Sequence, residues 1–273
     1  MEWSFRIATI HKVPIRVHIT LIFVLVWVWL AYFQKSGMNS AWEAVGFIVA
    51  VFACIAAHEL GHTLIAQFYG INVDSITLYP IGGAASLTRE THVPKEELLI
   101  AVAGPLVNLV IFAILFGLFH LGNLELLGGT TSQMSGFMLK LASANLFLAV
   151  FNLIPAFPMD GARILRAVLS HWLDNITATR TTATIGQGIA IILGFVGLFT
   201  NPLLMVIALL IFLSASSEAR QADLIDISQK VNVGDVMITE FETFTRSTNL
   251  QQAVDRLLAT TQSEFPVVDA RVG

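Results

Sequence analysis

The sequence predicts an all-α membrane protein with six transmembrane helices, a membrane-associated β-hairpin or sheet beside them, and a partial α/β tail. Of the 273 residues, 55% are hydrophobic and only 12% are charged, whereas a soluble domain has roughly 25% charged residues. Six stretches are apolar over about the 20 residues that a helix needs to cross a bilayer. The chain becomes polar again after residue 216, with the periodicity of a soluble segment.

Short polar segments separate the six predicted spans. These spans are residues 18–33, 44–69, 98–121, 136–154, 184–199 and 202–216. The fourth span breaks at "PAFPMDG", because proline ends a helix, and a further helix is expected from Ala162 to Trp172. The first 23 residues lack the cleavage site of a signal peptide, so we interpret them as a retained amphipathic lead-in to the first span.

The distribution of basic residues supports this count, because cytoplasmic loops of membrane proteins collect Lys and Arg. With a cytoplasmic N-terminus, thirteen basic residues fall on the cytoplasmic side, and only Lys35 and Lys140 fall on the other. The pattern therefore predicts six spans with both termini in the cytoplasm. The cytoplasmic set comprises Arg6, Lys12, Arg16, Arg89, Lys95, Arg163, Arg166, Arg180, Arg220, Lys230, Arg246, Arg256 and Arg271.

Two segments outside the spans read as strands. Residues 71–94 alternate in polarity and contain the pair Gly82-Gly83. They predict a hairpin or sheet that lies either against the membrane-embedded site or at the protein surface. The tail reads as a strand, a helix from Leu250 to about Thr260 and a second strand at "FPVVD".

The tail is predicted to be part of a larger soluble module, because about forty residues cannot easily bury a core alone. A nucleic-acid partner is not expected, since no cluster of Lys and Arg is visible in the sequence. The predicted domains are the six-span region at 1–220, a linker at 221–231 and the partial module at 232–273.

The second predicted span carries "HELGH", with His58, Glu59 and His62. Residues four apart share one face of a helix, so the two imidazoles can bind one zinc ion. Glu59 is rotated by roughly 100° from His58, and it can instead take a proton from a water whose pKa zinc lowers to about 7. Ionisable groups inside a span are costly and usually mark function, which favours this interpretation over two satisfied structural histidines.

A catalytic zinc ion usually has three protein ligands, so the chain needs another. Asp160 fits, because it follows the break after the fourth span at a compatible depth in the membrane. The alternative is that Asp160 only caps the helix that follows.

Cys54 lies four residues before His58, and apolar packing is favoured for it over contact with the metal. Asn108 and Asn145 are expected to form hydrogen bonds between helices.

These motifs give the sequence a resemblance to the site-2 protease family of intramembrane zinc metalloproteases, over residues 5–220. The matching stretches are "HELGH", "AGPLVN" (103–108) and "NLIPAFPMDG" (152–161). The resemblance implies that His58, His62 and Asp160 hold one zinc ion and that Glu59 is the general base. It also implies that Asn152 holds the substrate backbone or stabilises the oxyanion.

The resemblance extends to substrate and tail. It implies that a membrane-embedded strand accepts the substrate in extended form. That strand corresponds to Gly82, Gly83, Ala84, Ala85 and Ser86. The tail resembles the first half of a CBS domain, as in the family branch that senses adenine nucleotides, and a nucleotide would need the complete module. The resemblance implies regulated intramembrane proteolysis, in which a transmembrane protein substrate is cut within the lipid bilayer of a prokaryotic cell. A homo-oligomer is compatible with this interpretation.

Two other functions compete with proteolysis. An ion or metal transporter could use the same His and Asp residues as an ion pathway, but transporters often contain inverted repeats, and the sequence shows none. A catalytically inactive scaffold is disfavoured, because every residue needed for hydrolysis is present.

Overall fold

The fold is that of a computed structural model, which describes residues 3–80, 82–88, 91, 93–123, 132–230, 232, 234, 237, 241–260, 262 and 264–269. The chain divides into two compact units, Met1–Asp223 and Leu224–Gly273. The first unit holds most of the apolar helices and a small sheet, and the second holds the polar C-terminal tail.

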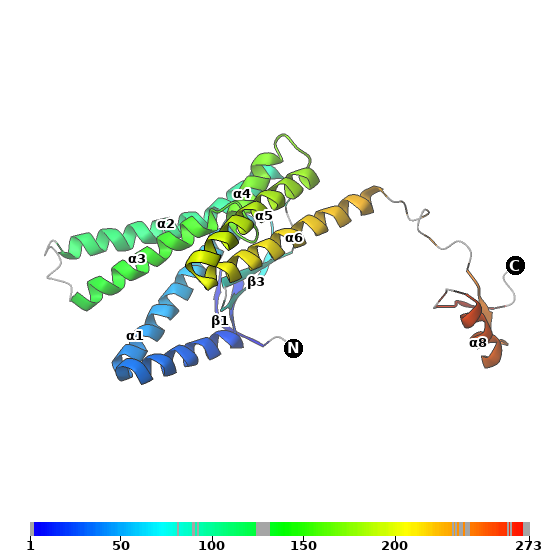
Figure 1. The fold of residues 1–273 in the computed structure, drawn as a ribbon, viewed down its shortest axis with the longest axis horizontal. Coiled ribbons are helices and arrows are strands. Elements are labelled where there is room, and N and C mark those ends of the chain that lie inside the picture. The colour runs from blue at the N-terminus through cyan, green and yellow to red at the C-terminus, as the bar shows by residue number, and fades with distance from the viewer. Residues whose placement is uncertain are drawn as a thin grey trace. The chain divides into compact units, whose positions relative to one another are not determined.

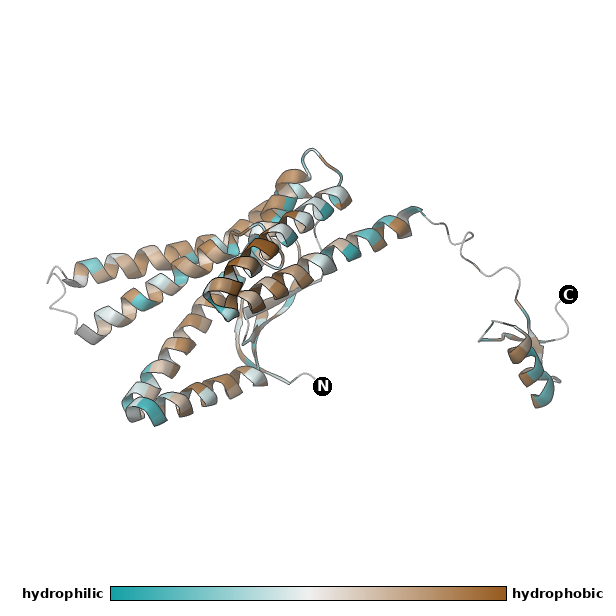
Figure 2. Ribbon diagram, viewed as in Figure 1, coloured by the Kyte–Doolittle hydropathy of each residue, from teal (hydrophilic) through white to brown (hydrophobic). Residues whose placement is uncertain are grey.

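Among the described residues, five helices are long and apolar enough to cross a membrane, which makes this a multi-pass membrane protein. Figure 2 shows that the residues of these helices are mostly hydrophobic, whereas α6 becomes hydrophilic toward its end. The five are α1 (Ile19–Phe68), α2 (Pro94–Asn123), α3 (Ser132–Asn152), α5 (Asn175–Thr200) and α6 (Pro202–Lys230).

The described part of the structure has five such helices, whereas the sequence predicts six, because helix α1 contains two of the predicted spans. A straight helix of its 50 residues would be about 75 Å long, more than twice the ~30 Å thickness of the hydrocarbon core. The helix is broken at Gly37, whose φ of 83° and ψ of −176° are not helical. Figure 1 shows the two arms of α1 meeting at a sharp bend. The first two predicted spans lie on these two arms.

A four-stranded sheet lies beside the helices, with the order β1-β2-β3-β4. Strands β1 (Ser4–Ile10) and β2 (Val13–His18) are antiparallel, β2 is parallel to β3 (Val73–Tyr79), and β3 is antiparallel to β4 (Gly82–Leu87). The strands predicted within residues 71–94 are therefore confirmed. The segment interpreted as an amphipathic lead-in to the first span forms the hairpin β1–β2, whose strands were not predicted.

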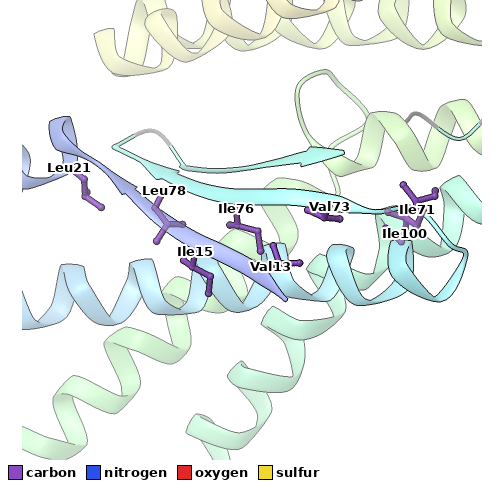
Figure 3. Packing of buried hydrophobic residues seen from close by; sticks show 9 residues of the cluster. Val13, Ile15, Leu21, Ile71, Val73, Ile76, Leu78 and Ile100 are labelled. Atoms are coloured by element: carbon purple, nitrogen blue, oxygen red, sulfur yellow. The ribbon is translucent and has the colours of Figure 1, made fainter. Parts of the chain in front are cut away.

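The inner face of the sheet packs on the second arm of α1. Ile15, Ile76 and Leu78 are buried in one cluster that includes Ala66 of α1. Figure 3 shows these three side chains pointing from the sheet toward the helix. Burying an isoleucine contributes about 1.5–3 kcal/mol to folding, so this cluster fixes the sheet against the helix that carries "HELGH".

The break after α3 is the other feature that positions the site. Helix α3 ends at Asn152, and the short helix α4 (Asp160–Leu169) begins after the proline-containing loop. Gly161 permits this close turn, because a Cβ at Gly161 would lie 2.3 Å from the carbonyl oxygens of Leu153 and Ile154. The predicted break and the following helix are both confirmed.

The C-terminal unit contains the predicted strand, helix and strand. Strands β5 (Phe244–Thr245) and β6 (Val267–Val268) are parallel. Helix α8 (Leu250–Ala259) begins with a capping box formed by Asn249 and Gln252. Helix α6 continues as far as Lys230, through most of the segment predicted as a linker.

Candidate active site

Three ionisable side chains converge where α1 meets the start of α4. Nε2 of His58 lies 3.0 Å from Nε2 of His62, and Oδ2 of Asp160 lies 3.1 Å and 3.2 Å from these two nitrogens. His58 and His62 are only 5% and 9% exposed. Oδ2 of Asp160 is buried without a hydrogen-bond partner among the described residues, whereas the two Nε2 atoms lie within hydrogen-bonding distance of each other.

The separations of these atoms fit a zinc ion. A tetrahedral zinc with bonds of about 2.0 Å has ligand atoms about 3.3 Å apart, close to the three distances observed here. Imidazole nitrogen and carboxylate oxygen are also the donors that catalytic zinc prefers. Among the described residues, this is the one group of three such side chains placed to hold a metal ion.

The backbone of α2 sets the tautomer of His62. Nδ1 of His62 lies 2.7 Å from the carbonyl oxygen of Ile100. A carbonyl can only accept a hydrogen bond, so Nδ1 must carry the proton. Nε2 of His62 then keeps its lone pair for the cluster, which is the form that binds a metal.

Asn108 of α2 occupies the equivalent position beside His58. Its amide nitrogen lies 3.2 Å from Nδ1 of His58, and its amide oxygen is buried without a partner. An amide can present either atom, and a half-turn would let the oxygen accept a hydrogen bond from the N–H at Nδ1, which leaves the lone pair of Nε2 for the cluster. Asn145 donates to Sγ of Cys54 at 3.3 Å. The predicted hydrogen bonds between helices are confirmed for both asparagines.

Gly104 gives the two imidazoles their space. A Cβ built on Gly104 would lie 2.2 Å from Nε2 of His62 and 2.7 Å from Cε1 of His58. Both distances are far below an ordinary contact, so only glycine fits at this point of α2. The sequence places Gly104 four residues before Asn108 in a predicted span, so the two share one face of a helix. It did not show that this face lies against the two histidines.

Glu59 lies beneath strand β4. A Cβ built on Gly83 would lie 2.6 Å from Cγ and 3.0 Å from Oε1 of Glu59. The carboxyl group also lies close enough to His58, His62 and Asp160 to interact with them electrostatically. Strand β4 is last in the order of the sheet, so among the described residues the segment Gly82–Ser86 has a strand partner on one side only.

The remaining predicted site residues are placed less closely. Asn152 is the last residue of α3 and is half-buried, and in the described part of the chain it forms no hydrogen bond to the cluster.

The alternative that Asp160 only caps α4 is wrong. Met159 is the N-cap residue, and Asp160 is the first helical residue with its side chain directed to the histidines.

Two imidazoles and a carboxylate that share one point, with a further glutamate beside them, can bind zinc and activate water. Set among apolar helices, this arrangement defines the class of protein as a membrane-embedded metallohydrolase. The model of Peptidase family M50 matches residues 46–124 and 122–196. The chain belongs to this family.

Comparison with individual proteins agrees with this assignment. The chain is 35% identical to a zinc metalloprotease of Methanocaldococcus jannaschii over 98% of its own length and 76% of that protein. It is 27% identical to stage IV sporulation protein FB of Bacillus subtilis, over 66% of this chain and 61% of that protein. The solved structure of a site-2 protease from M. jannaschii matches with a TM-score of 0.56 and 31% identity, covering 89% of this chain and 99% of that one.

Proposed function

We propose that this chain is an intramembrane zinc endopeptidase that cleaves transmembrane protein substrates, with one zinc ion held by His58, His62 and Asp160. The observation that carries the proposal is the convergence of the three ligand atoms to within 3.2 Å of one another. Their position on a spanning helix and at a helix break supports a site that works inside the bilayer.

The chemistry divides between the metal and the protein. When bound, zinc polarises the scissile carbonyl and lowers the pKa of water to about 7. Glu59 then accepts a proton from the attacking water as its oxygen bonds to the carbonyl carbon, and passes that proton to the leaving amine nitrogen as the C–N bond breaks. The carbonyl of Ile100 keeps the proton of His62 on Nδ1, away from the reacting atoms.

The substrate is proposed to bind as an added strand. A helical peptide bond is shielded by its own hydrogen bonds, so a transmembrane segment must unwind before hydrolysis. The edge of β4 at Gly82, Gly83, Ala84, Ala85 and Ser86 can pair with such an extended segment through main-chain hydrogen bonds. Asn152, whose neutral amide can donate a hydrogen bond, is proposed to stabilise the oxyanion or the substrate backbone.

The finer topology is also a proposal. The two arms of α1, divided at Gly37, would give six spans with both termini in the cytoplasm, in a prokaryotic cell membrane. The boundaries 1–220, 221–231 and 232–273 stand as proposed domains. The tail is proposed to be part of a CBS domain, which would bind an adenine nucleotide only when complete. A homo-oligomer is compatible with the proposal.

Removing the metal tests the proposed function. The purified chain in lipid vesicles is expected to cleave a transmembrane substrate, to stop when a zinc chelator is added, and to recover when zinc is restored. Gel analysis of the fragments measures this cleavage. Activity that persists in metal-free protein would contradict the proposal. Ion flux into the vesicles without cleavage would favour the transporter instead.

Replacing Asn108 with leucine, which has nearly the same shape, is expected to weaken zinc binding by about 10–100-fold. The reason is that the imidazole of His58 loses the partner that fixes its orientation. Competition with a chelator of known affinity measures the change. Asn145→Leu is the matched control, because Asn145 is equally buried but bonds to Cys54. Equal zinc affinity in both variants would show that Asn108 does not contribute to zinc binding.

A further inference from the structure

An ion pair joins α2 to α4 within the membrane unit. Nε of Arg166 donates to Oε1 of Glu97 at 2.7 Å, and Nη2 of Arg166 donates to the same oxygen. The side chains of Arg166 and Glu97 are 22% and 11% exposed. The guanidinium of Arg166 also lies 6.0 Å from the centre of the buried ring of Phe157. Neither residue belongs to the proposed catalytic machinery.

Helix α2 touches the site along a single face. Glu97, Ile100, Gly104 and Asn108 are spaced by three or four residues, which places them on one side of a helix. Ile100 fixes His62, Gly104 makes room for both imidazoles and Asn108 faces His58. Glu97 is the remaining member of this face, and it reaches the third proposed ligand indirectly, through α4.

Helix α4 carries both Asp160 and Arg166, and its other contacts are apolar, including the buried cluster of Ala162 with Ala183 of α5. Its buried residues are Gly161, Ala162 and Ala167, whose small side chains allow close packing but offer no directional bond. Among the described residues, the contact with Glu97 is the one polar side-chain link between α4 and α2. Metal ligands must be placed to within about 0.2 Å, so a small shift of α4 would carry Asp160 away from the histidines.

We infer that Glu97 and Arg166 are positioning residues, which hold Asp160 at coordination distance from His58 and His62. The inference rests on the zinc site of the proposed function. His58 and His62 lie one turn apart on the same helix, so their spacing is set locally. Asp160 comes from a separate short helix, and its distance depends on the contact that holds this helix to α2.

The test is the zinc affinity of Glu97→Gln, measured by chelator competition on the full chain in detergent or lipid. We expect the dissociation constant to rise by about 10–100-fold. Glu96→Gln is the matched control, because Glu96 is the adjacent residue and accepts a hydrogen bond from Thr91 instead. Exchanging the partners, as Glu97→Arg with Arg166→Glu, is expected to recover part of the affinity.

A second measurement separates positioning from a merely structural role. Cobalt replaces zinc, and its visible absorption spectrum reports the coordination of the ion. We expect the spectrum of Glu97→Gln to move toward that of Asp160→Asn. A pair that only stabilises the fold would lower the melting temperature and leave the cobalt spectrum and the zinc affinity unchanged, and that result would overturn the inference.

Two further variants make every outcome informative. If Glu97→Gln does not fold, Arg166→Lys keeps the charge and loses the paired donors, and wild-type zinc affinity in that variant would overturn the inference. Asp160→Asn separates the two proposals. Wild-type zinc affinity in Asp160→Asn would contradict the metal site itself, whereas loss in Asp160→Asn together with normal affinity in Glu97→Gln would contradict only the positioning role.

Discussion

Replacing Glu59 with glutamine is expected to slow cleavage of a transmembrane substrate by about 10²–10⁴-fold while one zinc ion stays bound per chain. Glutamine has nearly the same shape but cannot accept a proton from the attacking water. The three proposed ligands remain in place, since Glu59 is not one of them. Single-turnover cleavage and the zinc content of the purified protein measure the two effects separately.

The control for this variant is Glu43→Gln, which removes an exposed carboxylate from the same helix. Cleavage by Glu59→Gln at the rate of this control would exclude Glu59 as the general base. Loss of zinc together with activity would instead make Glu59 part of the metal site. Comparing membrane-protein fragments in cells that carry the active and Glu59→Gln forms would also identify the substrate.

Replacing Gly104 with alanine is expected to weaken zinc binding beyond the ~100-fold typical of changes outside the ligands themselves. The new methyl group would lie 2.2 Å from Nε2 of His62 and 2.7 Å from Cε1 of His58, so at least one imidazole must move. Overpacking of this kind costs about 1–3 kcal/mol of stability, which need not unfold the protein. Zinc content after purification is the measurement.

Gly117→Ala is the matched control on the same helix, because a Cβ at Gly117 meets nothing within 4 Å. Alanine in a helix interior is more favourable than glycine by roughly 0.5–1 kcal/mol, so this variant should fold and bind zinc normally. Equal zinc content in Gly104→Ala and Gly117→Ala would show that the imidazoles have more freedom than the structure indicates.

The sequence predicted the parts of the site whose spacing is local. His58 and His62 had to share a helical face, and a proline break in an apolar stretch pointed to Asp160. Asp160 was the candidate because zinc needs a third ligand, with a helix cap as the alternative, and the family resemblance implied the same role. Its approach to the histidines depends on how α4 packs, which no local pattern determines.

Other features depend on contacts between distant segments, and sequence patterns miss these. The N-terminal residues form strands because β2 finds a parallel partner in β3, more than fifty residues later. The Glu97–Arg166 pair joins two residues that appear in the sequence as ordinary charges, Glu97 just before a predicted span and Arg166 within the predicted helix that follows the break. The merging of two predicted spans into α1 depends on the conformation of Gly37, which glycine permits but does not require.

If the edge of strand β4 binds the substrate as proposed, its composition bears on how substrates are selected. From Gly82 to Ser86, no side chain is larger than the hydroxymethyl group of serine, so the edge offers no pockets of its own that could distinguish one substrate side chain from another. Main-chain pairing recognises an extended backbone whatever its sequence. Cleavage at such an edge would favour segments that unwind easily, with glycine or proline near the cut, over segments that share a sequence motif.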